Sequence, residues 1–351
     1  MINYIIRRFL TMPITLFGMT ILIFLMLWVL GPSARSALYV ADIPKNAAVM
    51  DGIIKKYGLD DPIYVQYWNW LVGRPDPDHE GQIIGGILRG DFGYSRSFSR
   101  PVVELLKLRF PATLELTLYA FLPIIFIGVW LGVQAAVRHN QWIDQFARLF
   151  SIVGYSFPVF VLGILLMMVF YAQLRWFPVE RISDWVKLTG YTKYTSLVTV
   201  DAILNGRLDI WWDAIRHLLL PIITLSYTSW AAFLRITRSS MLETLRQEYV
   251  TTARAKGVLE KDVINKHARP NALIPVATYS GITVAYLLGG VVITETIFNF
   301  PGMGSAAADA AGRFDVVTVL AFTLITGLIL ILANLVVDIL YAMLDPRIRL
   351  G

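Results

Sequence analysis

The chain has 351 residues, of which 56% are hydrophobic and 16% are charged, and its formal net charge is +6. This balance excludes an ordinary soluble globular protein and predicts an all-α integral membrane protein. Cysteine is absent, which excludes disulfides, thiol chemistry and cysteine metal sites. The four histidines are scattered without metal-ligand spacing, so we expect neither a metal site nor a resident cofactor.

Six apolar segments are long enough to cross a bilayer, since a membrane helix needs about 20 residues. We expect these helices at about residues 9–30, 113–137, 150–171, 217–236, 272–293 and 316–344. Pro111 is expected in the first turn of the second helix, and Pro158 is expected to kink the third. The first apolar segment is too long for the core of a cleavable signal peptide, so we interpret it as a membrane helix.

Two of the connecting segments are large and almost balanced in charge. Residues 31–109 carry ten basic and nine acidic residues, and residues 172–216 carry six and five. The first contains aromatic residues at amphipathic spacing within 45–71, which predicts short interfacial helices, followed by turn-rich sequence. The second is rich in Trp and Tyr; an interfacial belt is favoured over a sugar-stacking surface.

Residues 239–270, which connect the fourth and fifth expected helices, form a long polar and basic stretch. Ser240 and Glu243 have the spacing of a capping box, which predicts that a helix starts there. Gly257 is placed to end it in the left-handed conformation, and a second helical run is expected from Glu260 to His267, stopping before Pro270. The pattern predicts a helix-turn-helix that docks on a partner, in preference to a solvated basic loop.

Six spans place both termini on one side of the membrane, together with the 239–270 stretch. The short connections on that side hold fourteen basic against six acidic residues. The positive-inside rule therefore predicts that both termini and this stretch are cytoplasmic. The net positive charge is thus explained by membrane topology, and we expect no nucleic-acid partner.

Sequence signatures of catalysis are missing. The chain has no phosphate-binding loop, nucleophile elbow, His-Glu-x-x-His pair or dinucleotide fingerprint, so we expect a non-catalytic protein. A stand-alone secondary transporter is an alternative, but it would need a carboxylate near mid-membrane. The candidate carboxylates are expected near helix ends or outside the spans: Glu115, Glu295, Asp309, Asp315 and Asp338.

Several stretches resemble one transporter family. YVTTARAKG, KHARPNALIPV, LLGGVVITETIFNFPGMG and NLVVDILYAMLDPRIR are similar to the dipeptide/oligopeptide (and nickel) branch of ATP-binding-cassette importer permeases, in the group of first permease subunits. GLDDPIYVQYWNWL, GDFGYS, RFPATLELTLYA and GYSFPVFVLGILL extend the resemblance over nearly the whole chain. The chain departs from the pattern at Arg269-Pro270 and in the length of residues 172–216.

The resemblance implies a type I importer permease fold with six membrane helices. It divides the chain into residues 1–30 (tail and first helix), 31–109 (external segment) and 110–351 (core permease domain). That domain would hold five helices, the coupling loop 239–270 and the external insertion 172–216. The resemblance also implies that these residues of the loop contact an ATPase: Glu248, Tyr249, Thr251, Thr252, Ala253, Arg254, Ala255, Lys256 and Gly257.

The implied function is the translocation path of an ATP-driven importer in the cytoplasmic (inner) membrane. The implied partners are a second homologous permease, an external solute-binding protein and two cytoplasmic ATPases, which bind ATP and Mg²⁺. Peptides are the favoured cargo, with oligosaccharides or nickel chelates as alternatives. The sequence does not single out substrate-binding residues.

Overall fold

The computed structural model describes residues 2–40, 46–289 and 291–344. In this part of the chain, helices and two short hairpins follow one another. The first third holds α1 (Ile2–Val29), α2 (Gly31–Arg35), η1 (Ser36–Leu38), α3 (Ala47–Lys56), α4 (Ile63–Val72), β1 (Arg74–Pro75), β2 (Ile83–Ile84), η2 (Ile87–Arg89), β3 (Tyr94–Ser95) and β4 (Arg100–Pro101). The middle holds α5 (Val102–Val137), α6 (Trp142–Ser156), α7 (Val159–Leu166), η3 (Met167–Gln173), α8 (Asp184–Leu188), α9 (Val198–Leu204) and α10 (Leu208–Thr244). The last part holds α11 (Glu248–Ala255), α12 (Glu260–Asp262), η4 (Val263–Ala268), α13 (Arg269–Ala272), α14 (Ile274–Leu288), α15 (Val292–Ile297), α16 (Met303–Gly312) and α17 (Val316–Leu344).

Three helices of the described residues are long and apolar enough to cross a membrane alone, in α1, α5 and α17. Three further spans are possible if each bent pair of helices counts as one: α6 with α7–η3, the two halves of α10, and α12–α13 with α14. The pairs bend by 98°, 45° and 49° respectively. The predicted six spans thus agree with the upper count.

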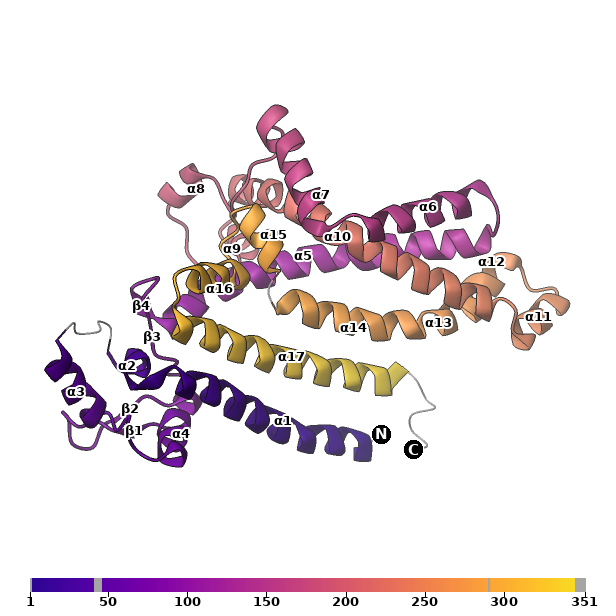
Figure 1. Cartoon of the computed structure of the whole chain (residues 1–351). Coiled ribbons are helices and arrows are strands. Elements are labelled where there is room, and N and C mark those ends of the chain that lie inside the picture. The colour runs from indigo at the N-terminus through magenta and orange to yellow at the C-terminus, as the bar shows by residue number, and fades with distance from the viewer. Residues whose placement is uncertain (1, 41–45, 290, 345–351) are drawn as a thin grey trace.

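The bundle is built around α5 and α10, which pack along each other while α6, α14 and α17 lie around them (Figure 1). Two glycines of α5 allow this close approach. A Cβ at Gly128 would lie 2.5 Å from Phe233 Cβ, and one at Gly132 would lie 2.5 Å from Thr237 Cβ. The largest apolar core follows this contact and continues into the polar stretch, where it includes Val250.

Two expectations about the spans are wrong. The second span begins at Val102, directly after the β3–β4 hairpin, so Pro111 lies inside α5 and not in its first turn. The third span is not one kinked helix: residues 142–156 are already helical, and the chain turns by 98° at Phe157-Pro158. Phe157 is extended, as the residue before a proline prefers to be, so the break is sharper than a kink.

The external segment forms the expected short helices α3 and α4. Trp70 of α4 is buried, and Tyr67 makes edge-on ring contact with Phe24 of α1, so α4 packs against the first span. Within the predicted insertion 172–216, the long helix α10 already begins at Leu208.

The two ends of the bundle are formed by different segments (Figure 1). The beginning of α1, the end of α17 and the helix α11 lie at one end, and α3, α4, both hairpins and α8 lie at the other. The polar stretch therefore lies at the same end of the bundle as the start of the first span and the end of the last span.

Candidate coupling surface and its attachment

The polar stretch begins later than its sequence indicated. Ser240 lies inside α10, which runs on to Thr244, so the predicted capping box does not start a helix. The Thr244 hydroxyl donates to the Ser240 carbonyl oxygen at 2.7 Å, as expected within a continuing helix. A turn over residues 245–247 then leads to the separate eight-residue helix α11, with Gln247 as its extended N-terminal neighbour.

Gly257 ends this helix as predicted. Its φ is +78°, and its N–H donates to the Arg254 carbonyl at 2.9 Å while the Val258 N–H donates to the Ala253 carbonyl at 3.3 Å. These bonds satisfy carbonyl groups at the helix end, and the left-handed conformation favours glycine. The chain can therefore reverse direction within two residues and return towards the bundle.

The returning segment does not stop before Pro270. It continues through the π-helical turn η4 into α13, where Pro270 occupies the first turn. A proline is tolerated in a first helical turn because its missing N–H would have no helical partner there. The prediction that Pro270 ends the second helix is therefore wrong, and the bend lies three residues later, at Leu273.

The coupling helix has one buried side. Val250 and Ala253 are buried against the returning segment, in the same apolar cluster as Val263 and Met241. This packing fixes the orientation of α11 on the end of the bundle. The other eight of the nine predicted contact residues are exposed: Glu248, Tyr249, Thr251, Thr252, Arg254, Ala255, Lys256 and Gly257.

Two features of this surface were not predicted. Leu259 is 74% exposed beside the helix end, and with Tyr249, 43% exposed, it adds apolar area to a polar surface. Arg254, one of the predicted contact residues, forms an ion pair within the loop. Its Nε and Nη2 donate to the two carboxylate oxygens of Glu260 at 3.0 and 2.7 Å, which joins α11 to α12.

The base of the coupling loop is attached by a buried carboxylate that sequence reasoning missed. Asp144, fully buried on α6, accepts from Arg238 of α10 at 2.5 Å (Nε to Oδ1) and 3.0 Å (Nη2 to Oδ2). It also accepts from the Asn140 backbone N–H at 2.9 Å and from Arg148 at 3.3 Å. One carboxylate therefore joins the α5–α6 connection to α10 two turns before the loop begins.

A second contact reinforces this attachment. The Arg235 guanidinium lies 4.4 Å from the centroid of the Tyr155 ring and donates to its hydroxyl at 2.9 Å. A cation over an aromatic face is stabilised by the ring quadrupole. Arg235 and Arg238 lie nearly one turn apart on α10, so both attach it to α6.

Comparison with known proteins identifies the family of this sequence. Residues 1–117 match the family profile described as "Binding-prot-dependent transport system membrane comp, N-term", and residues 124–350 match "Binding-protein-dependent transport system inner membrane component". The chain belongs to this family of transport permeases.

Individual relatives agree with this assignment. The chain is 38% identical over 305 residues to the probable D,D-dipeptide transport system permease protein DdpB of Escherichia coli, covering 87% of this chain and 85% of the relative. It is 36% identical over 353 residues to the dipeptide transport system permease protein DppB of Alkalihalophilus pseudofirmus, covering 99% and 100%. It is 35% identical over 350 residues to the glutathione transport system permease protein GsiC of Salmonella typhimurium, covering 99% of each. The chain is thus the non-catalytic membrane component of a binding-protein-dependent transport system.

Glu115 and Glu295, two of the carboxylates considered for a proton relay, accept hydrogen bonds that join segments of the permease. Glu115 accepts from Arg181 at 2.7 Å and from the Thr199 backbone N–H at 2.7 Å, which holds the insertion on α5. Glu295 accepts from the Thr113 hydroxyl at 2.7 Å and from the Ser305 N–H at 2.8 Å, near the first turn of α16. Asp309 is exposed, and the side chain of Asp338 lies outside the described residues.

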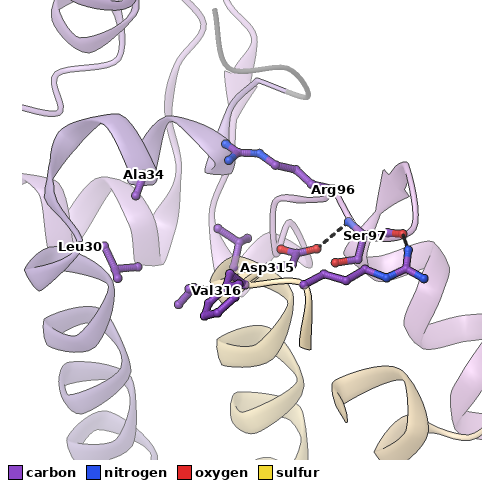
Figure 2. Close-up of a pocket in the computed structure, with 9 residues that line it drawn as sticks. Leu30, Ala34, Arg96, Ser97, Asp315 and Val316 are labelled. Atoms are coloured by element: carbon purple, nitrogen blue, oxygen red, sulfur yellow. Dashed lines mark hydrogen bonds between the residues drawn. The ribbon is translucent and has the colours of Figure 1, made fainter. Parts of the chain in front are cut away.

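Asp315 joins the β3–β4 hairpin of the permease to the start of α17. Its carboxylate accepts from the Ser97 N–H at 3.0 Å, the Ser95 hydroxyl at 2.8 Å and the Thr318 hydroxyl at 2.7 Å. Figure 2 shows this contact beside a cavity of about 310 Å³, which Leu30 and Ala34 line from the opposite side. Burial alone would raise the pKa of Asp315, but these hydrogen bonds hold it below its ordinary value.

Proposed function

We propose that the chain is a transmembrane permease subunit of an ATP-driven importer, and that α11 is the helix through which ATPases act on it. The observation that carries this proposal is the construction of α11. One side is anchored by Val250 and Ala253, and the other presents eight exposed residues beyond the bundle. A stiff element with an unoccupied polar face can make different contacts in two states of a partner, which coupling requires.

The proposed assembly contains this chain, a second homologous permease, two ATPases and an external solute-binding protein. The chain has no phosphate-binding loop, so ATP and Mg²⁺ would be bound by the ATPases. The family description itself supports a binding protein. The three-part division into 1–30, 31–109 and 110–351 belongs to the same proposal.

The proposed orientation places α11 and both termini in the cytoplasm. The helix α11, the beginning of α1 and the end of α17 lie at the same end of the bundle (Figure 1). The short connections that the sequence predicts on that side hold fourteen basic residues, which favour the cytoplasmic side of an inner membrane. The segments α3, α4 and α8 would then face the binding protein.

Force would pass from α11 into the bundle by two routes. The first is the covalent continuation into α10 and α14 on either side of the loop. The second is the contact of Arg238 with Asp144, through which movement of α10 acts on α6. Closure of the ATPases would tilt these helices together and change which side of the membrane has access to the path.

Short peptides are the proposed cargo. Relatives that cover nearly the whole chain are named as permeases for D,D-dipeptides, dipeptides and glutathione, all of which contain peptide bonds. Oligosaccharides and nickel chelates are the alternatives that the experiment must exclude.

The decisive experiment reconstitutes the complete complex in liposomes with its binding protein and a labelled dipeptide. We expect uptake that needs both ATP and the binding protein. Calorimetry of the binding protein against peptide, glycan and nickel-chelate panels identifies the cargo. Uptake by this chain alone on an ion gradient would refute the importer assignment, and tight glycan binding without peptide binding would refute the cargo.

A further inference from the structure

The insertion contains a cavity that the coupling mechanism does not use. It measures about 490 Å³ and lies where the end of η3, the start of α8 and the first turns of α10 meet. Small-molecule sites in proteins usually have volumes of about 300–1,000 Å³. The residues that line it are Tyr171, Ala172, Arg175, Phe177, Pro178, Ser183, Asp213 and Arg216.

Two guanidinium groups line this cavity without a carboxylate partner. Within the part of the chain that the structure describes, neither Arg175 nor Arg216 forms an ion pair, whereas Arg181 and Arg207 nearby do. Arg216 donates from Nη2 to the Trp176 carbonyl at 2.7 Å, which fixes its position and leaves its remaining N–H groups to donate elsewhere. Arginine is well suited to bind a carboxylate through paired N–H groups.

The backbone at Arg175 adds to this picture. Its φ is +54°, in the left-handed region that residues with a Cβ adopt only when the surroundings require it. Such conformations concentrate at binding sites. The conformation here places an exposed arginine at the cavity instead of the glycine that the backbone would favour.

The same cavity holds a carboxylate in a fixed orientation. Asp213 accepts from the Ser183 N–H at 2.9 Å and from the Ser183 hydroxyl at 2.6 Å. The buried His217 lies behind it, with Nε2 at 3.2 Å from the same hydroxyl and at 3.6 Å from Asp213 Oδ2. Each carboxylate oxygen has a further lone pair that can accept from an ammonium group. Tyr171 and Phe177 supply apolar wall between the charged groups.

We propose that this cavity is a binding site for the two charged ends of a short peptide on the external face of the permease. The peptide carboxylate is bound by Arg175 and Arg216, its ammonium by Asp213, and its side chains contact the aromatic wall. This inference rests on the proposed importer function and deepens it, because it assigns the insertion a role in receiving the cargo. A neutral oligosaccharide has neither charged end, so it would offer these three groups hydroxyls but no opposite charge.

The test uses the assembled permease–ATPase complex in nanodiscs without its binding protein. The probes are L-alanyl-L-alanine, its C-terminal amide and its N-acetyl derivative, and binding is measured by calorimetry. We expect the free dipeptide to bind about tenfold or more tightly than either derivative. Arg175→Ala and Arg216→Ala should remove the preference over the amide, and Asp213→Asn should remove the preference over the acetyl derivative.

Arg207→Ala is the matched control, because Arg207 lies in the same insertion but pairs with Asp209. It should bind all three probes like the wild type. Equal binding of the dipeptide and both derivatives to the wild type, or unchanged preferences in the arginine variants, overturns the site. Equally tight binding of inorganic phosphate also overturns it, by showing a general anion site.

Failure of the site and failure of the importer function remain distinguishable. Binding-protein-dependent dipeptide uptake by the same wild-type complex in liposomes tests the function separately. If uptake occurs without discrimination in nanodiscs, the site is wrong and the importer stands. If no ATP-dependent uptake occurs, the function itself is wrong.

Discussion

Replacement of Gly257 by valine should uncouple ATP hydrolysis from transport. A Cβ at Gly257 would meet no atom within 4 Å, so the whole cost arises from the backbone. With φ at +78°, a residue with a Cβ costs about 1–2 kcal/mol relative to glycine, and a β-branched residue lies at the upper end. A free-energy change of about 1–2 kcal/mol changes a population ratio about 5- to 30-fold. The valine variant therefore populates the correctly terminated conformation of α11 less than the wild type does by a factor of this size.

The assay measures ATP hydrolysed per dipeptide transported by complexes in liposomes. We expect Gly257→Val to assemble and hydrolyse ATP while transport falls at least about fivefold. Gly257→Asn is the matched variant, because asparagine tolerates the left-handed region, and it should retain most of the transport. Gly18→Val, at an exposed position of α1 without positive φ, controls for added bulk. Full transport at wild-type stoichiometry by an assembled Gly257→Val complex would refute the reasoning.

Three other predictions follow from the contacts. Asp144→Ala leaves Arg238 without its carboxylate partner, and loss of one partner of a buried pair costs about 3–5 kcal/mol. The melting temperature of the purified complex should therefore fall sharply. Asp209→Asn, which removes one partner of an exposed pair, should change the melting temperature little. Gly132→Ala would place its Cβ 2.5 Å from Thr237 Cβ and should lower the melting temperature, whereas Gly312→Ala, with no atom within 4 Å, should not. Asp315 has a folded-state pKa below the ordinary 3.8, so its contribution to the free energy of unfolding is complete above pH 3.8 and is lost as the pH falls through the lowered pKa. The difference in melting temperature between the wild type and Asp315→Asn should therefore shrink in acid. A difference that does not depend on pH would contradict the assignment.

The long spans were predictable because lipid imposes a simple rule. A helix that crosses hydrocarbon satisfies its backbone polar groups internally and presents apolar side chains, so its sequence is a continuous apolar segment. The helices expected at residues 9–30 and 316–344 agree with Leu10–Val29 and Val316–Leu344. The left-handed Gly257 was also predictable, because few residues other than glycine accept that conformation.

The errors occur where tertiary packing overrides a local signal. Ser240 and Glu243 have the spacing of a cap, but Met241 is fully buried in the core, so α10 continues past them. Pro270 would end an isolated helix, but here it lies in the first turn of α13, after a π-helical turn. The Asp144–Arg238 contact joins residues 94 positions apart and has no local pattern that could reveal it.

One helix connects the coupling surface with the proposed peptide site. The helix α10 has 37 residues and a length of about 55 Å measured along its axis through the 45° bend, and it leads from Asp213 and Arg216 near its start to the turn before α11. Arg175 and Ser183 lie on separate segments, so a tilt of α10 would move Arg216 relative to Arg175. The proposed site for the peptide carboxylate would then change shape when the ATPases move α11. Cargo release and ATPase closure would thus be coupled through a single helix, without a separate signal between the two faces of the membrane.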